Sequence, residues 1–461
     1  MDSDAQFEDN TVMTLNYNTS WNNETVLQQG HLEATLAAFN QDTPQNWLVS
    51  GEKSRHDLHG LIRYPAMMVP SMQGDILDAI LREVGTDVHV IDPFVGSGTV
   101  MTEAVRRGLE FTGIDINPLA ILICQAKSSV EAGNCLDSAV VQVLEAVKSD
   151  WSEVVEVDFH KRDKWFEPHQ LILFSRFRRA ILGISDRAKR SCLWVVFAET
   201  IRSCSRTRTS TYKLHKRPDG EVVSEKAILD TFERNLYSLL DRVAEYKADR
   251  AFALQSAPTP ELICSATENT CFRRRGSHRV VITSPPYGDN RTTIPYGQFS
   301  YLALNWIPCS DLPKVPVSTG LANPAAIDFA SLGGSLKDAE QKTAKIEAIS
   351  TTAKEFFASA RVAKNEEKLR KVGAFLWDYY VALKKVNECV GAPSHWVITS
   401  GNRTSAETLV PFDQIGREII ESFGGKWIKN VERRLPVKRM PSKNNRGDMI
   451  TTESTLVASF G

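Results

Sequence analysis

The stretch His89-Val90-Ile91-Asp92-Pro93-Phe94-Val95-Gly96-Ser97-Gly98-Thr99 combines a short apolar run, a glycine-rich turn and the start of a helix. About twenty residues later, Phe111-Thr112-Gly113-Ile114-Asp115 has the pattern of a second buried strand that ends on an acid. In such a strand–loop–helix–strand unit, the glycines let the backbone approach a cofactor and the acid hydrogen-bonds ribose hydroxyls. The stretch lacks a full Gly-x-Gly-x-x-Gly, which favours a cofactor other than a dinucleotide.

A second stretch, Ile282-Thr283-Ser284-Pro285-Pro286-Tyr287, ends another short apolar run. The two prolines stop the strand because neither can donate a ladder hydrogen bond and each fixes φ. The resulting rim holds the Ser284 hydroxyl, the neighbouring carbonyls and the Tyr287 ring in set directions. It would suit a flat ring with an amino group, although an isolated Ser-Pro-Pro-Tyr is also typical of a strand end that packs an aromatic side chain.

Taken together, these segments resemble the motifs of amino-group DNA methyltransferases, which modify cytosine N4 or adenine N6. Residues 92–99 and 113–118 resemble motif I and the acidic motif after it. Residues 283–287 resemble catalytic motif IV, in the Ser-Pro-Pro-Tyr form associated with cytosine-N4 enzymes, and residues 63–70 resemble motif X, which lines the other side of the cofactor pocket. The resemblance covers most of the chain from about residue 55 and implies a Rossmann-like α/β sheet that binds S-adenosyl-L-methionine.

The resemblance also implies the site residues. The expected catalytic residues are Ser284, Pro285, Pro286 and Tyr287. The expected cofactor-binding residues are Tyr64, Pro65, Asp92, Pro93, Phe94, Gly96, Gly98, Thr99, Asp115 and Asn117. The expected reaction is methyl transfer to the exocyclic N4 amine of cytosine in a specific duplex sequence, by base flipping and direct transfer.

Other reactions remain open at this stage. Adenine-N6 methyltransferases share these motifs, and RNA-base methyltransferases have a similar combination of Asp-Pro-Phe-x-Gly-x-Gly and Pro-Pro-Tyr. A third alternative is a non-catalytic nucleic-acid-binding protein with the same fold. The presence of both loop glycines, of Asp115 and of the complete Ser-Pro-Pro-Tyr tetrapeptide argues against it. A carbon-five cytosine methyltransferase would need a nucleophilic cysteine after a proline, and Pro308-Cys309 falls in the wrong place.

The domain organisation follows from segment lengths. Residues 1–50 form a polar arm rich in Asn, Gln and Thr, and residues 51–150 with 260–461 form the catalytic domain. This domain has a second insertion at about 310–370 and a closing antiparallel hairpin near its end. Residues 151–250 are too long for a connection within a compact α/β sheet, so we expect a mainly helical insertion there.

The insertion contains a basic run that is a candidate for target recognition. Six cations fall within sixteen residues with no acid among them: Arg202, Arg206, Arg208, Lys213, Lys216 and Arg217. Arg and Lys bind phosphate oxygens, although a charge run is often only a solvated surface. Two polar loops offer further candidate contacts to nucleic acid, through Arg291 and through Lys438 and Arg439.

Bulk properties agree with an ordinary globular protein. Apolar residues make up 42% of the chain and charged residues 24%, with a net charge of −1, so any nucleic-acid surface must be local. The eight cysteines form no Cys-x-x-Cys pair and have no histidine at zinc spacing, so we expect no metal. No signal peptide or membrane-length apolar run is present, which predicts a cytoplasmic protein. The resemblance implies double-stranded DNA as partner, and a cognate restriction or defence nuclease of a restriction–modification pair.

Overall fold

The structure, a computed structural model, describes residues 31–48, 55–131, 133, 135–250, 258–288, 293–314, 323–361, 365–405, 408–435 and 451–461. The predicted contacts Arg291, Lys438 and Arg439 lie outside these residues. The same is true of residues 1–30 of the polar arm.

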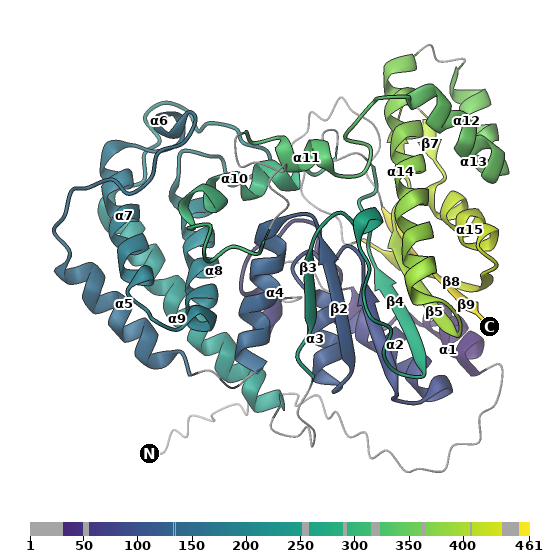
Figure 1. Cartoon of the computed structure of the whole chain (residues 1–461), viewed down its shortest axis with the longest axis horizontal. Coiled ribbons are helices and arrows are strands. Elements are labelled where there is room, and N and C mark those ends of the chain that lie inside the picture. Colours follow the sequence, from purple (N-terminus) through teal and green to yellow (C-terminus); the bar gives the residue numbers. More distant parts are fainter. Residues whose placement is uncertain are drawn as a thin grey trace, which may run out of the picture.

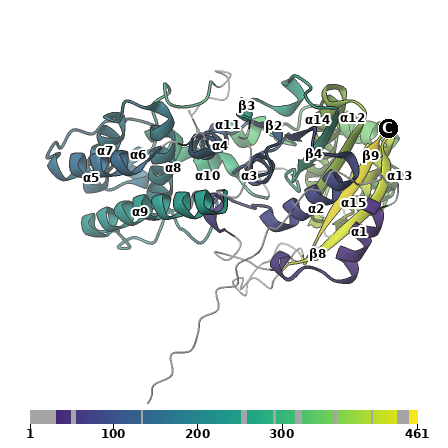
Figure 2. The ribbon, with the colours of Figure 1, turned by 90° about the horizontal axis from the view of Figure 1, so that it is seen from below.

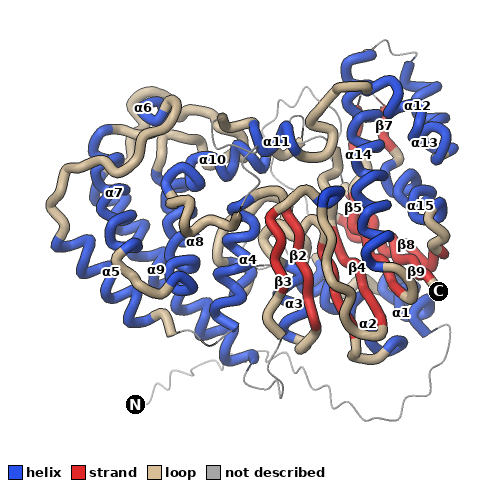
Figure 3. The backbone as a smooth tube through the Cα atoms, viewed as in Figure 1, coloured by secondary structure: helices blue, strands red, loops and turns tan. Residues whose placement is uncertain are grey.

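In the described part of the chain, seven strands form one sheet in the order β3-β2-β1-β4-β5-β9-β8 (Figures 1 and 3). Strands β3 to β5 in this order are parallel, whereas β9 is antiparallel to both β5 and β8. The bounds are β1 Val88–Asp92, β2 Glu110–Asp115, β3 Glu261–Cys264, β4 His278–Thr283, β5 Ser394–Ser400, β8 Lys426–Arg434 and β9 Thr452–Phe460. The predicted α/β sheet and its closing antiparallel hairpin are confirmed.

The strand order reverses between β1 and β4, which lie side by side although residues 93–277 separate the end of β1 from the start of β4 in the chain. The sheet continues from β1 to β2 and β3 on one side, and from β4 to β5 on the other. Ligands of open α/β sheets bind at the carboxyl ends of the strands, beside such a switch point. The glycine-rich loop follows β1 and Ser284 follows β4, so this topology brings the two motifs to the same point.

Alternating side chains of the strands enter two cores. Val90, Val280 and Val397 are buried on one face, and Ile91 and Val281 are buried on the other. Two groups of helices cover these faces. The first face packs on α1 His31–Gln41, α2 Pro70–Val84 and α3 Thr99–Arg106, and the second packs on α12 Ala339–Ile349, α13 Thr351–Ala360, α14 Glu366–Val390 and α15 Phe412–Ser422.

A third core lies within the helical insertion, which stands at the end of the molecule beyond β3 (Figures 1 and 2). Its aromatic side chains interlock, and the rings of Phe177 and Phe232 stack with centroids 4.0 Å apart. The helices of the insertion are α6 Arg162–Trp165, α7 Pro168–Leu182, α8 Arg187–Cys204 and α9 Glu225–Arg250. Three helices from outside residues 151–250 contribute to the same core: α4 Pro118–Glu131, α5 Asp137–Ser149 and α10 Tyr296–Trp306. The expected helical character of this insertion is confirmed.

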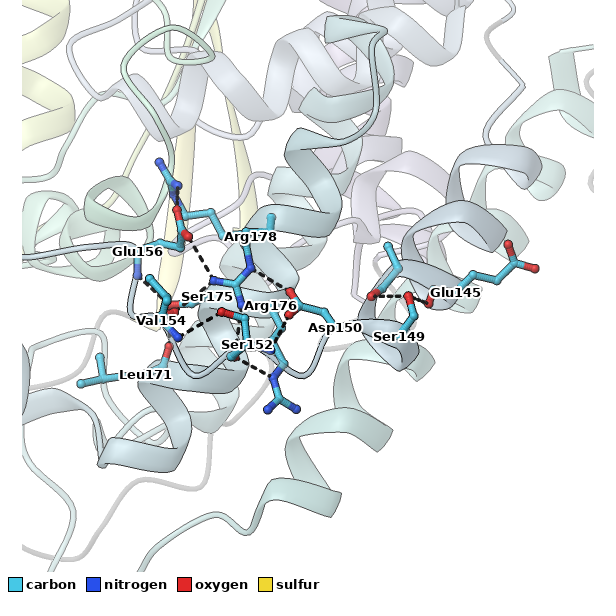
Figure 4. Close-up of polar contacts among 12 residues, drawn as sticks. Glu145, Ser149, Asp150, Ser152, Val154, Glu156, Leu171, Ser175, Arg176 and Arg178 are labelled. Atoms are coloured by element: carbon cyan, nitrogen blue, oxygen red, sulfur yellow. Dashed lines mark hydrogen bonds and ion pairs between the residues drawn. The ribbon is translucent and has the colours of Figure 1, made fainter.

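The segment between α5 and α6 is held on α7 by polar contacts rather than by a strand (Figure 4). Arg179 donates to the Asp150 carboxylate at 2.7 Å and to the Val154 carbonyl at 3.0 Å. Arg178 binds Glu156 at 3.1 Å. The segment is therefore fixed, although the side chain of Trp151 is exposed to solvent.

Shorter elements complete the described chain. They are η1 Gln45–Trp47, η3 Asp57–Gly60, η4 Thr267–Asn269, α11 Ala326–Ala330, and the two-stranded pair β6 Arg403–Ser405 and β7 Thr408–Val410. Within the polar arm, α1 is joined to β8 because Asn40 donates to the Asn430 carbonyl at 2.7 Å. Among the described residues, no helix is both long and apolar enough to span a membrane.

Candidate active site

The glycine-rich loop between β1 and α3 needs glycine at two positions. Gly96 and Gly98 have φ values of 50° and 76°, a region that side chains with a Cβ rarely adopt. A Cβ on Gly98 would also lie 2.9 Å from Cys124 Sγ, and one on Gly96 would lie 3.4 Å from the Tyr64 ring. Both glycines therefore let the loop turn tightly between α4 and Tyr64.

Asp115, at the end of β2, holds this loop. Its carboxylate accepts hydrogen bonds from the backbone N–H of Gly96 at 2.9 Å and of Asn117 at 2.8 Å. Burial raises the pKa of this carboxyl to about 6, and the two backbone N–H groups partly oppose that rise. Each carboxylate oxygen has a second lone pair, so Asp115 can still accept a hydrogen bond from a ligand hydroxyl.

A cavity of about 860 Å³, open to solvent, lies over this loop at the carboxyl ends of the strands. Most of the predicted cofactor residues line it, and so do two predicted catalytic residues. The predicted residues that line it are Tyr64, Pro65, Pro93, Phe94, Gly96, Thr99, Asp115, Asn117, Ser284 and Pro286. Asp92, Gly98, Pro285 and Tyr287 are not among its lining residues.

Tyr64 and Asn117 build one wall of the cavity together. The Asn117 side chain donates to the Tyr64 hydroxyl at 3.2 Å and to the Ser300 hydroxyl at 2.7 Å. Its amide oxygen accepts from the Leu119 N–H, which caps the start of α4. The Tyr64 ring stacks near Tyr296, with centroids 5.8 Å apart. Segments far apart in the sequence are thus joined into one rigid side of the cavity.

Asp92 acts below the cavity rather than in it. Its carboxylate accepts from the Thr283 hydroxyl at 2.7 Å and from the Phe94 N–H at 3.1 Å. Its Oδ2 atom is buried and has no hydrogen-bond partner among the described residues. Burial raises the pKa of Asp92 to about 7, while the bond from Thr283 opposes that rise. Asp92 therefore fastens the end of β1 to the end of β4, just before Ser284.

Ser284 and Tyr287 line two different cavities. Their hydroxyls are 3.2 Å apart, and the Tyr287 hydroxyl also donates to Glu453 on β9 at 3.4 Å. Ser284 lines the large cavity, whereas Tyr287 lines a smaller one of about 240 Å³. The walls of the smaller cavity are completed by Gly288, Lys371, Val372, Phe375, Arg403, Val410 and Phe412. Tyr287 thus lines the smaller cavity and is not among the residues that line the cavity of Ser284.

Two parts of the large cavity were not predicted from the sequence. Thr267 and Glu268, which follow β3, contribute one part, and Thr267 donates to the Pro93 carbonyl at 2.7 Å. The other part is α11 and the residues after it, with Ile327 and Leu332 on the cavity. Asp328 holds α11 in place by accepting from the Gly297 N–H at 2.8 Å, at the start of α10. Only tertiary packing reveals these walls.

The basic run forms a loop that packs beside the cavity. Its ends pair through an antiparallel bridge between Thr207 and Lys216, and the Leu214 N–H donates to Gln298 on α10 at 3.2 Å. The Arg202 guanidinium donates to the Thr211 carbonyl and lies 5.1 Å from the Phe299 ring centroid. Arg202 is therefore engaged within the protein.

Acids outside the run compensate several of its charges, which the sequence had not suggested. Arg206 pairs with Glu167 at 2.8 Å, and Lys216 pairs with Asp219 at 2.5 Å. Arg217 donates to backbone carbonyls, including that of Ser203 at 2.7 Å. Arg208 is exposed and Lys213 is half-buried, so these two side chains are better placed to meet a phosphate.

The sheet order, the switch point and the cavity beside it define a Rossmann-like fold of the methyltransferase type. The chain is similar to the Type II methyltransferase M.MvaI of Kocuria varians, with 26% identity over 421 residues, 86% of this chain and 88% of that relative. It is also similar to the Type II methyltransferase M.MjaII of Methanocaldococcus jannaschii, with 27% identity over 125 residues, 27% of this chain and 23% of that relative. No protein-family model and no solved structure matches the chain. The two similarities support the resemblance to DNA methyltransferases.

Proposed function

We propose that this protein transfers a methyl group from S-adenosylmethionine to the exocyclic N4 amine of cytosine in a specific duplex DNA sequence. One observation supports the proposal more than any other: Ser284 and Pro286 line the same cavity as Gly96 and Asp115. The residues that resemble the catalytic motif thus share a cavity with those that resemble the cofactor motif. The Ser-Pro-Pro-Tyr form of the former favours cytosine.

The cavity suits S-adenosylmethionine. Its lining combines apolar side chains with a small number of polar groups, as is usual for small-molecule sites. The Asp115 carboxylate would accept from the ribose hydroxyls, and Phe94 and Ile116 offer apolar surface to the adenine ring. When bound, the cofactor supplies a methyl group on a positively charged sulfur.

Ser284 and the Pro285 carbonyl would then act on the target amine. The lone pair of an exocyclic amine is delocalised into the base, so the amine is a poor nucleophile. Two acceptors for its protons would draw the nitrogen towards tetrahedral geometry and aim the lone pair at the methyl group. The contribution of the protein is thus positioning and stabilisation of developing charge, without a covalent nucleophile.

A base within a duplex cannot reach this cavity, so it must be flipped out of the helix. Arg208 and Lys213 lie on the loop that packs against α10, beside the cavity, and would hold the backbone phosphates. Tyr287 would stack on the flipped base if the base enters between the Ser284 and Tyr287 hydroxyls and reaches the ring from there. A restriction nuclease of the same specificity would be the functional partner.

The direct test is methyl transfer in vitro. Purified protein and cofactor with a radioactive methyl group would be incubated with duplex DNA of many sequences, or with total RNA. We expect label in the DNA, and a rate of labelling lower on the order of 10²-fold when Ser284→Ala replaces the wild type. Label in RNA alone would contradict the proposal, and so would cofactor binding without transfer to any nucleic acid.

A further inference from the structure

A cluster of metal-ligand side chains lies at η3, outside the cavity. One side-chain ligand atom from each of His56, Asp57 and His59 lies within 4.8 Å of the other two. Asp57 and His59 are buried, with 0% and 1% of their surface exposed, whereas the His56 side chain is 40% exposed. Two of the three candidate ligands, Asp57 and His59, are thus buried, and solvent reaches the cluster at His56.

The hydrogen bonding of His59 points to a ligand. One ring nitrogen, Nε2, lies 2.9 Å from Glu103 Oε1 on α3. The other, Nδ1, is buried and has no hydrogen-bond partner among the described residues. A carboxylate on one nitrogen fixes the proton there and leaves the lone pair of the other available, which is the usual arrangement for a metal-binding histidine.

Asp57 is held in place by two other elements. Its N–H donates to Glu245 on α9 at 2.8 Å, and its carboxylate accepts from Arg106 on α3 and from the His59 N–H at 3.1 Å. Its φ of 43° is in the left-handed region, which residues other than glycine seldom occupy. Such a conformation persists where the surroundings impose it, and it is common at ligand sites.

We propose that His56, Asp57 and His59 bind a divalent transition-metal ion of the zinc class, with water at the remaining position. Two imidazoles and a carboxylate suit zinc, and the exposed side of His56 provides a path of entry. The cations Arg106 and Lys127 also face Asp57 and His59, so we expect micromolar affinity rather than the tighter binding of a closed structural site.

The bound ion would link two side chains of η3, Asp57 and His59, to His56 just before it, and His59 is in turn bonded to Glu103 of α3. The chain continues from η3 to Tyr64 and Pro65 on the cavity, so the ion would steady that wall. None of the three ligands lines the cavity, and the ion takes no part in the proposed methyl transfer. The metal site and the methyl transfer can therefore succeed or fail independently.

The test is metal titration of the full chain without a histidine tag, after chelator treatment. Zinc binding would be followed by calorimetry, and cobalt binding by visible absorption, which reports the coordination geometry of the ion. We expect one ion per chain and a higher Tm with zinc. Replacing a ligand, in His56→Ala, should weaken binding by more than the roughly 10–100-fold that the loss of an outer hydrogen-bonding partner causes.

His160→Ala is the matched control, because His160 is exposed and lies outside the cluster. The zinc affinity of this variant should equal that of the wild type. His56→Asn is a second variant that keeps a polar side chain, and circular dichroism would verify that both variants fold. Absence of binding at a zinc concentration of roughly 100 μM would overturn the proposal. Equal affinity in folded His56→Ala and wild type would overturn it as well.

Discussion

The Ser284 hydroxyl lies 3.2 Å from the Tyr287 hydroxyl, and this pair separates the large cavity from the smaller one. Ser284 therefore lines the large cavity, whereas Tyr287 lines the smaller one together with Phe375 and Phe412. A base that enters between them would exchange the bond between the two hydroxyls for bonds to its own amine.

Two single-atom changes distinguish a catalytic Ser284 from a structural one. Ser284→Ala removes the proposed acceptor and should lower kcat on the order of 10²-fold, with cofactor affinity unchanged, because the lost interaction belongs to the transition state. Tyr287→Phe removes the same bond from the other side but keeps the ring, and should lower kcat by less than about tenfold. Single-turnover kinetics and calorimetry provide the measurements. Equal losses in the two variants would mean that the bond between them, rather than proton acceptance, matters.

Cofactor affinity should depend on pH through Asp115. Burial raises the pKa of its carboxyl to about 6, so the carboxyl is partly protonated in weak acid. A ribose hydroxyl binds the ionised carboxylate more strongly than the neutral carboxyl, and binding therefore lowers this pKa and releases a proton below about pH 6. Affinity should rise as pH rises through about 6 and level off above it. Calorimetry between about pH 5 and pH 8 would measure this rise.

Asp115→Asn is the control for this pH dependence. It keeps the shape and an acceptor oxygen but cannot ionise, so the rise in affinity should disappear. A rise of the same size in the variant would assign the titration to another group, for which Glu268 is a candidate, since burial raises its pKa and it lines the same cavity.

The bond between Thr283 and Asp92 should contribute to stability. Thr283→Val keeps the side-chain shape and removes the only hydroxyl that donates to the buried Asp92 carboxylate among the described residues. Leaving a buried polar group with fewer partners costs about 1–3 kcal/mol. We expect the free energy of unfolding to fall by that amount in urea titrations at about neutral pH. An unchanged free energy would show that this bond does not fasten β1 to β4.

The basic loop should bind DNA mainly through Arg208. Arg208→Gln should reduce the slope of log affinity against log salt by about 0.9, the value for one phosphate contact. Lys426→Gln is the control, because Lys426 is exposed at the start of β8, on the edge of the sheet opposite the cavity. Equal slopes for Arg208→Gln and wild type would remove this loop from the DNA interface.

The parts of the site that the sequence predicts are local in the chain. The turn at Gly96 and Gly98, the acid after β2 and the proline rim after β4 each follow from a few neighbouring residues. Periodicity likewise predicts the sheet and the helices of the insertion, because the apolar pattern of each element is short-range. These features needed no knowledge of the partners across the fold.

The remaining features depend on tertiary contacts that no short pattern contains. The cations of the basic run had no acid nearby in the sequence, yet Glu167 pairs with Arg206 from the start of α7. Asp92 belongs to the motif but lies beneath the cavity, because its carboxylate binds Thr283. Tyr287 follows Ser284 closely, yet its hydroxyl donates to Glu453 on β9 and its side chain lines the other cavity. Long-range pairing decided each of these outcomes.

The most direct test of cytosine-N4 methylation is nucleoside mass spectrometry of DNA from cells that express the wild type or Ser284→Ala. Cells without a methyltransferase of their own provide the background. We predict N4-methylcytosine at one recurring duplex sequence with the wild type, and its loss with the variant. N6-methyladenine in place of N4-methylcytosine would contradict the cytosine assignment, and unmodified DNA alongside methylated RNA would contradict the account as a whole.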